Sequence, residues 1–213
     1  MQAARMALQR LNQILSDNSG RIDGILVGLE KVVGGGEKEK PKPIYDLTLA
    51  AKPSGPAKVD QNTQLVVGEP AAVVALQTQR IIARSPSGEI APVGDAQWAD
   101  TLPKFLQQKL IQAYEDEGYL AAVLPPLDQA KPNYQLVIDL RNFAVVSAPE
   151  QAADIEFSAK IMADDGRIVG AQFFHVSAPA KGDNADAIVV AFNQAFGQIA
   201  GELIAWTRKT ITT

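Results

Sequence analysis

A run of glycine, charged residues and proline divides this chain of 213 residues and limits the folds available to it. Residues 34–43 read Gly-Gly-Gly-Glu-Lys-Glu-Lys-Pro-Lys-Pro. Three glycines end a helix, and the alternating charges and two prolines resist regular structure. We therefore expect an N-terminal helix over residues 1–33, a flexible linker over residues 34–43, and a folded body over residues 44–213 that is long enough to bury a core.

Apolar side chains recur through residues 1–33 at alternating intervals of three and four, which is the spacing of a heptad repeat. This pattern predicts a long amphipathic helix with one apolar seam. The seam residues are Leu8, Leu11, Leu15, Asn18, Ile22, Ile25, Leu29 and Val32. The same helix contains glycines at positions 20, 24 and 28. Each glycine costs about 1 kcal/mol in a helix interior, so the helix needs a partner along its seam.

Two kinds of partner for the seam are compatible with the sequence. The helix either packs on its own body or forms a coiled coil or bundle with other chains, and the second arrangement predicts a homo-oligomer. Asn18 is the polar member of the seam, and it either fixes the register or marks a break between two shorter helices. Arg21, Asp23 and Glu30 argue against a location inside a bilayer. Because the chain opens in the middle of this helical pattern, we expect it to be part of a longer protein.

The body changes to the alternation typical of strands. Strands are expected over residues 44–49, 64–67, 79–84, 119–124, 134–146, 152–162 and 167–176. One helix is expected to begin after an N-cap at Asp100 or Thr101 and to end at Glu117, and a second to begin after an N-cap at Asp183 or Asn184 and to extend to about residue 206. Residues 69–76 fit either a helix or an extended segment. Residues 134–146 are apolar on both faces, which is typical of a central strand, and Asp164-Asp165-Gly166 predicts a hairpin.

We predict an α+β fold of two layers for this order of elements. It has a mixed, largely antiparallel sheet with two main helices on one face. The long N-terminal amphipathic helix precedes this body.

The composition excludes several classes of function. The chain has no cysteine and one histidine, so thiol chemistry and metal sites built from cysteines or several histidines are excluded within it. A net charge of −4 argues against nucleic acid as a partner. We find no phosphate loop, dinucleotide fingerprint or nucleophile elbow, and we expect no catalytic residue, no metal and no cofactor. His175 is interpreted as an ordinary strand residue, although a hydrolase would have to use it.

One segment is a candidate for binding a hydrophobic ligand or a partner. Tyr119, Val123 and Leu124 precede two consecutive prolines. They form either an exposed apolar loop with that role or part of a strand in the core. Trp98 and Trp206 flank or lie in amphipathic helices, so we expect both to pack in the core rather than to stack on a ligand.

A set of motifs follows in order along the body. They are Ile44-Tyr-Asp-Leu, Gln79-Arg-Ile-Ile-Ala-Arg, Gln97-Trp-Ala-Asp-Thr-Leu-Pro103, the strand Tyr134–Phe143, the hairpin at Asp165-Gly166 and the closing Glu202-Leu-Ile-Ala-Trp206. In combination they resemble the auxiliary-component family of ABC-type lipid transporters, the group that includes the PqiC-like lipoproteins. The resemblance extends over residues 44–208.

This resemblance implies a periplasmic, non-enzymatic partner of a mammalian-cell-entry (MCE) transporter. Such systems move phospholipids or similar hydrophobic molecules between the inner and outer membranes, using an ABC permease, an ATPase and a ring of MCE-domain subunits. Family members usually begin with a lipidated cysteine, whereas this chain contains no cysteine. Its N-terminal helix is instead similar to the helical tail that follows an MCE domain. The resemblance thus implies an MCE protein fused to its own auxiliary domain and tethered to the inner membrane through a region ahead of this chain.

Three hypotheses for the function follow. The first is an interaction module of a lipid-transport complex, which acts through protein contacts and contacts to lipid. The second is a stand-alone carrier of a lipid or a small hydrophobic ligand, and it predicts an apolar pocket between the sheet and the helices. The third is a hydrolase that relies on His175.

Overall fold

The structure, a computed structural model, describes residues 42–48, 60–127, 131–147 and 150–212. One compact unit spans Pro43–Thr213. The helix predicted over residues 1–33 lies outside the described residues, as does the linker up to residue 41. The expectations for the seam therefore stay predictions.

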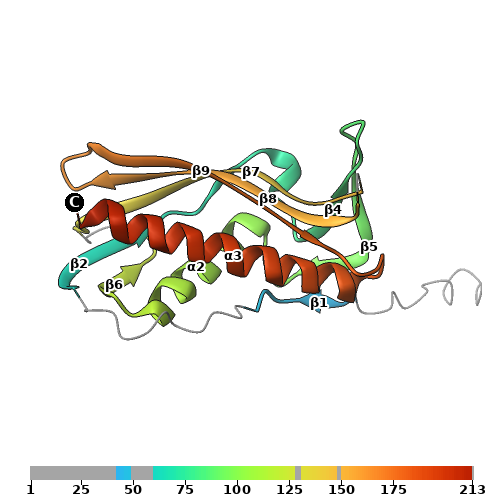
Figure 1. Cartoon of the computed structure of the whole chain (residues 1–213), viewed down its shortest axis with the longest axis horizontal. Helices are drawn as coiled ribbons and strands as arrows, with labels where there is room; N and C mark the ends of the chain where they lie inside the picture. The colour runs from blue at the N-terminus through green and yellow to red at the C-terminus, as the bar shows by residue number, and fades with distance from the viewer. Residues whose placement is uncertain (1–41, 49–59, 128–130, 148–149, 213) are drawn as a thin grey trace, which may run out of the picture. The chain divides into compact units, whose positions relative to one another are not determined.

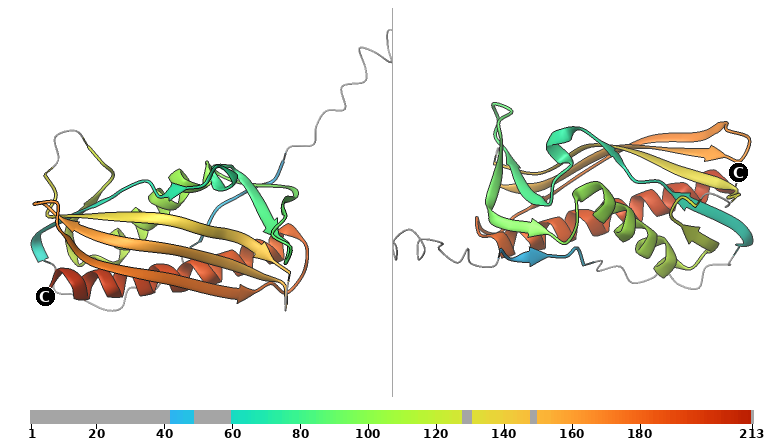
Figure 2. Two further views of the ribbon diagram at one scale, coloured as in Figure 1. Left: turned by 90° about the horizontal axis from the view of Figure 1, so that it is seen from above. Right: turned by 180° about the vertical axis from the view of Figure 1, so that it is seen from behind.

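The unit has two layers, a sheet and two helices that lie on the same side of it (Figure 1 and Figure 2). In chain order the elements are β1 (Ile44–Tyr45), β2 (Asp60–Val67), β3 (Ala71–Ala72), the 3-10 helix η1 (Val74–Leu76), β4 (Arg80–Arg84), β5 (Ile90–Trp98), α2 (Leu102–Glu117), β6 (Leu120–Leu124), β7 (Tyr134–Val146), β8 (Ala152–Ala163), β9 (Ile168–Pro179) and α3 (Ala185–Ile211). The predicted α+β class and the two main helices are confirmed for the body.

Strand β7 organises the sheet. On one side it pairs antiparallel with β8, and β8 pairs antiparallel with β9 through the predicted hairpin. On its other side β2, β3 and β4 follow one another, and all three run parallel to it. These short strands are parallel because the chain crosses back through β5, α2 and β6 before it reaches β7. The sheet is mixed, as predicted, and its longest pairings are antiparallel.

Three local assignments differ from the prediction or settle it. Residues 69–76 contain both candidate structures, since β3 pairs with β7 and η1 follows it. Strand β5 was not predicted, because Pro92 and Gly94 interrupt its alternation, yet it pairs with β4 and with β1. The first strand is shorter than expected: β1 ends at Tyr45 rather than at residue 49.

Both helices begin where the sequence predicts. Helix α2 follows Thr101 and ends at Gly118, whose φ of 61° is a left-handed conformation that glycine adopts readily. Helix α3 follows Asn184, whose Oδ1 accepts a hydrogen bond from the N–H of Ala187 at 2.8 Å. That bond identifies Asn184, rather than Asp183, as the N-cap. By length and composition α3 resembles a membrane span, but 56% of its most apolar window is buried within the unit.

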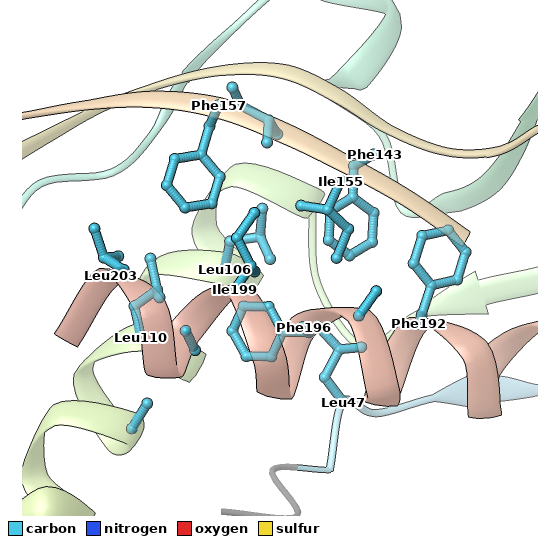
Figure 3. Close-up of a cluster of buried hydrophobic side chains, with 14 of the residues drawn as sticks. Leu47, Leu106, Leu110, Phe143, Ile155, Phe157, Phe192, Phe196, Ile199 and Leu203 are labelled. Carbon is cyan, nitrogen blue, oxygen red and sulfur yellow. The ribbon is translucent and has the colours of Figure 1, made fainter. Parts of the chain in front are cut away.

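An aromatic cluster joins the two layers. The indole of Trp98 stacks on Phe105 of α2 with 5.7 Å between the ring centroids. Phe143 of β7 stacks on Phe192 of α3 at 4.7 Å, and Trp98 meets Phe192 edge to face at 5.3 Å. Figure 3 shows aliphatic side chains from α2, β8 and α3 filling the rest of this space. Trp98 is 1% exposed, which confirms that it is a core residue.

Candidate interaction surface

The segment predicted to bind a hydrophobic ligand lies in the core. Tyr119 and Val123 are buried, and Leu124 is half-buried. Residues Leu120–Leu124 form β6, which pairs with β2 and packs against α2. Of the two alternatives, the exposed apolar loop is therefore contradicted at Tyr119 and Val123, since both are buried, and Val123 lies in a strand of the core. The seam residues from Leu8 to Val32 lie outside the described residues.

Tyr119 is held against the end of α3. The guanidinium carbon of Arg208 lies 4.3 Å from the centroid of its ring. Arg208 also approaches the carboxylate of Glu117, with 3.5 Å between nitrogen and oxygen. Among the described residues nothing forms a hydrogen bond with the Tyr119 hydroxyl. Burial raises the pKa of Tyr119 well above its ordinary value, although the Arg208 charge acts in the opposite direction. Tyr119 is a packing residue here.

The cavity between the sheet and the helices is small. Its lining residues are Pro70, Leu106, Leu110, Ile138, Leu140, Ile155, Phe157 and Phe196. It is apolar, as a carrier would require, but its volume is about 10 Å³. That volume accommodates about one water molecule, whereas ligand pockets measure about 300–1,000 Å³. The side chains of this core leave no room at this position for an acyl chain.

An open cleft lies where β7 begins and β8 ends. It has a volume of about 530 Å³, and Asn133, Tyr134 and Met162 form part of its lining. The Asn133 side chain is fixed, since its Oδ1 accepts a hydrogen bond from the backbone N–H of Gln64 at 2.8 Å. The charged residues of the lining, Lys131 and Asp164, are exposed. This cleft therefore presents no desolvated charge that would orient a ligand.

The face of β7, β8 and β9 that points away from the helices is termed the outer face (Figure 2). A chain of hydrogen bonds crosses all three strands on it. The Nδ2 of Asn142 donates to Oδ2 of Asp154 at 2.7 Å, and Oδ1 of Asp154 lies 2.8 Å from Nε2 of His175. The Asp154 side chain is 14% exposed and the His175 side chain 49%. The carboxylate thus fixes the orientation of a half-exposed imidazole.

The described residues around His175 do not form the geometry of a catalytic triad. Ser-His-Asp catalysis requires a hydroxyl hydrogen-bonded to the ring nitrogen that the carboxylate does not hold. Ser177 is the register partner of Asp154, but in the described part of the chain the ring of His175 bonds only to Asp154. Nowhere in the described part of the chain do three or more histidine, aspartate or glutamate side chains lie close enough together to hold a metal ion. What the arrangement supplies is an oriented polar side chain on an open surface.

An aromatic residue and an arginine lie on the same outer face as His175. The guanidinium carbon of Arg141 is 5.3 Å from the ring centroid of Phe173 on β9. The register of β7 against β8 shifts between Leu140 and Asn142, so Arg141 is the extra residue at this irregularity. Phe173 is 49% exposed on the same face. Arginine and aromatic side chains dominate the binding energy of many protein interfaces, which makes the outer face the candidate interaction surface.

This surface was not predicted, although the sequence contains a signal for it. The hairpin at Asp164-Asp165-Gly166 fixes the register of β8 against β9, which places Glu156 opposite His175. Strict alternation then assigns Asp154, His175 and Phe173 to one face. The contact between Arg141 and Phe173 was not accessible in this way, because the irregularity in β7 leaves no clear mark in the sequence.

Comparison with known proteins gives the family. A family model described as the ABC-type transport auxiliary lipoprotein component matches residues 45–204. An uncharacterised protein of Bradyrhizobium diazoefficiens, bll6063, is 37% identical over 227 residues, which cover 97% of this chain and 61% of that protein. The chain thus spans about three fifths of the length of this relative.

Two crystal structures share the fold. Protein XCC0632 from Xanthomonas campestris is 33% identical, with a TM-score of 0.73 over 80% of this chain and 97% of that one. An uncharacterised protein is 16% identical, with a TM-score of 0.63 over 79% of this chain and 99% of that one, and it shows the fold alone. The family model covers most of the body, including nearly all of the sheet and α3 as far as residue 204. The chain therefore belongs to the family of ABC-type transport auxiliary lipoprotein components.

Proposed function

We propose that this chain is a non-enzymatic component of an MCE-type ABC transporter that moves phospholipids or other hydrophobic molecules between the inner and outer membranes. The family match over residues 45–204 is the observation that carries this proposal. The chain acts in the periplasm through contacts with MCE-domain subunits, the permease and neighbouring copies of itself. The lipoprotein character of the family fits a location at the cell envelope.

The proposal includes a fusion of the auxiliary body to an MCE protein. Two observations support it. The heptad seam of residues 8–32 fits a helix that assembles with other copies. The relative from Bradyrhizobium diazoefficiens extends well beyond the region that this chain matches, so it has room for a further domain. The residues encoded ahead of Met1 test the fusion: an MCE domain preceded by one membrane span supports it, and a domain of another class contradicts it.

Protein contact is favoured over carriage of a lipid inside the body. The apolar cavity between sheet and helices holds about 10 Å³, while the outer face offers an arginine, a phenylalanine and an oriented histidine. A stand-alone carrier would instead need a cavity large enough for its ligand. We therefore assign lipid movement to the complex as a whole and assembly to this chain.

The seam is tested by the mass of the protein in solution. The change is Leu15→Asp together with Ile22→Asp, which places two charges in the seam. Light scattering should show a lower mass for this variant, because buried carboxylates oppose helix association. The matched control, Gln13→Asp with Ser19→Asp, adds the same charge outside the seam and should keep the mass of the parent. An unchanged mass in the seam variant would contradict assembly through this helix.

The partners are tested with the natural protein in its own membrane. Purification from detergent-solubilised envelope should recover an ABC permease and its ATPase in fixed proportion to the natural protein. Recovery without either subunit under crosslinking conditions would contradict a role in an ABC transporter. Deletion of the body after residue 43 should weaken this recovery while leaving the seam intact.

A further inference from the structure

Strand β9 is the last strand on its side of the sheet, and nothing among the described residues pairs with its second edge. It runs over Ile168–Pro179, and its recorded strand partner is β8. Figure 2 shows it as the outermost strand beyond β8, with no further strand alongside. An edge of this kind presents a row of backbone N–H and C=O groups that can pair with another strand.

From Gly170 onward, β9 lacks the features by which proteins usually protect such an edge. Those features are lysine or other charges, proline within the strand, a bulge at the edge, or very short length. Ile168–Pro179 contains no lysine, arginine, aspartate or glutamate, and its proline is the final residue. Its register with β8 shifts once near its start, where Val169 is an extra residue between Ile168 and Gly170, and it is regular from Gly170 to Pro179. Those residues span about 33 Å at the usual rise per residue of a strand.

The strand is also accessible to solvent at its centre. Ala171, Gln172 and Phe173 are exposed in succession, although neighbouring residues of a strand point to opposite faces. Helix α3 contacts β9 from the inner face, where Phe174 meets Trp206 with 5.6 Å between ring centroids. The helix therefore covers one face of the strand and leaves the central part of its edge open.

We propose that this edge pairs antiparallel with β9 of a second copy of the chain, so that the two sheets become one. Pairing about a two-fold axis perpendicular to the sheet keeps each outer face on the same side in both copies. The axis lies near the middle of the strand, which is the position that pairs the greatest length. Phe173 of one copy then lies opposite either Phe173 or His175 of the other, because only residues of the same face can oppose each other.

The lack of lysine, arginine, aspartate and glutamate in β9 favours a second copy of the chain over a strand of another protein. A self-pairing strand meets its own residues in reverse order, and an uncharged strand meets no like charge when it does so. Phe173 is 49% exposed in the single copy, and either register covers it with an aromatic ring. The contact with Arg141, 5.3 Å from the Phe173 centroid, remains on the outer face beside the joint. This pairing is independent of the seam and does not rest on the function proposed above.

The absence of cysteine makes a direct test possible. Directly opposed residues of an antiparallel pair have Cα atoms about 4.5–5.5 Å apart, a separation that a disulfide can bridge. Since the full chain has no cysteine, a single introduced cysteine reports only its own surroundings. Phe173→Cys alone should form a disulfide dimer if the axis passes through residue 173. An equimolar mixture of Phe173→Cys and His175→Cys should form the mixed dimer if the axis passes through residue 174.

The control is Val137→Cys, at a position that is 39% exposed on the same face but in the central strand. It should form disulfide dimers only at the rate of random collision. The proposal is supported if either arrangement at residues 173 and 175 exceeds that rate by at least tenfold. It is overturned if neither exceeds the control. Mixed Phe173→Cys and Val137→Cys dimers at a comparable rate would also overturn it, since they indicate non-specific contact.

The same measurement in the Leu15→Asp, Ile22→Asp background separates this proposal from assembly through the helix. In this background the disulfide at residue 173 should still form, while the mass of the assembly in solution should be lower than that of the parent. Its loss in that background would overturn an edge that pairs by itself. As a second readout without cysteine, Phe173→Lys should lower the mass measured in dilute solution, and Val137→Lys should leave it unchanged. Equal masses for Phe173→Lys and the parent would count against the pairing.

Discussion

A buried hydrogen bond between the two helices gives the sharpest prediction about stability. Tyr114 of α2 and Thr207 of α3 are both fully buried, and their hydroxyl oxygens are 2.7 Å apart. Thr207 donates its own proton to the carbonyl of Leu203 at 2.8 Å. Tyr114 must therefore be the donor in the bond between the two hydroxyls. Removing Thr207 therefore leaves a buried donor without an acceptor, whereas removing the Tyr114 hydroxyl leaves Thr207 with its bond to Leu203.

Removing the acceptor should be worse than removing the donor. Thr207→Val leaves the Tyr114 hydroxyl buried without an acceptor, and this should lower the free energy of unfolding by about 1–3 kcal/mol. Tyr114→Phe leaves Thr207 bonded to Leu203, so about 1 kcal/mol should be lost. The double variant has no stranded donor and should lose less than the sum of the single changes. The expected coupling is therefore about 1 kcal/mol or more.

Urea unfolding of the four proteins at neutral pH measures this cycle. Thr212→Val is the matched control. Like Thr207, Thr212 donates its hydroxyl proton to the backbone carbonyl four residues earlier, here that of Arg208 at 2.8 Å, but Thr212 is exposed. It should change stability by less than about 0.5 kcal/mol. Additive single effects, or a smaller loss for Thr207→Val than for Tyr114→Phe, would refute the assignment of donor and acceptor.

Three further predictions concern the same core. Tyr119→Phe removes a buried hydroxyl that bonds to none of the described residues, so urea unfolding should show a stability equal to that of the parent or up to about 1 kcal/mol higher. A clear loss of stability would mean that the hydroxyl has a hydrogen-bond partner. Burial raises the pKa of both Tyr114 and Tyr119 above that of an unfolded tyrosine, so stability present below about pH 10 should decline at higher pH, and the variant with both tyrosines changed to phenylalanine should decline less steeply. A Cβ on Gly170 would lie 2.6 Å from Cγ2 of Thr210, so Gly170→Ala should lower the free energy of unfolding by about 1–3 kcal/mol. Adding Thr210→Ser, which removes Cγ2, should restore part of the lost stability in thermal unfolding. If it restores none, the strain does not come from Thr210.

The outer face and the core were accessible from the sequence to different degrees. Alternation over residues 152–162 places the apolar side chains of Ile155 and Phe157 on one face, and both are buried. The same alternation assigns Asp154 to the outer face, but it does not reveal that Asn142 and His175 both bond to its carboxylate. Those bonds depend on how three strands align, and alignment depends on a register that no single strand encodes.

Tyr119 illustrates how a local pattern can mislead. An apolar run followed by two prolines fits an exposed loop as well as a core strand, because both have the same composition. The structure buries Tyr119, whose ring packs against Arg208 of α3, a residue far from it in the sequence. Strand β5 was missed for a related reason: Pro92 opposes Ile82 in a pairing with β4 that shifts register nearby, and a proline is tolerated at such a position.

What the sequence determined by itself is local. The ends of α2 at Thr101 and Gly118, the cap of α3 and the hairpin before Arg167 all follow from the conformations that single residues prefer. The tertiary structure alone decided which strands became neighbours, that the cavity beside Phe157 and Phe196 measures only about 10 Å³, and that β9 is the last described strand on its side of the sheet. These outcomes depend on pairing and packing between residues distant in the chain, and the free energy of such contacts belongs to the whole fold rather than to any one segment.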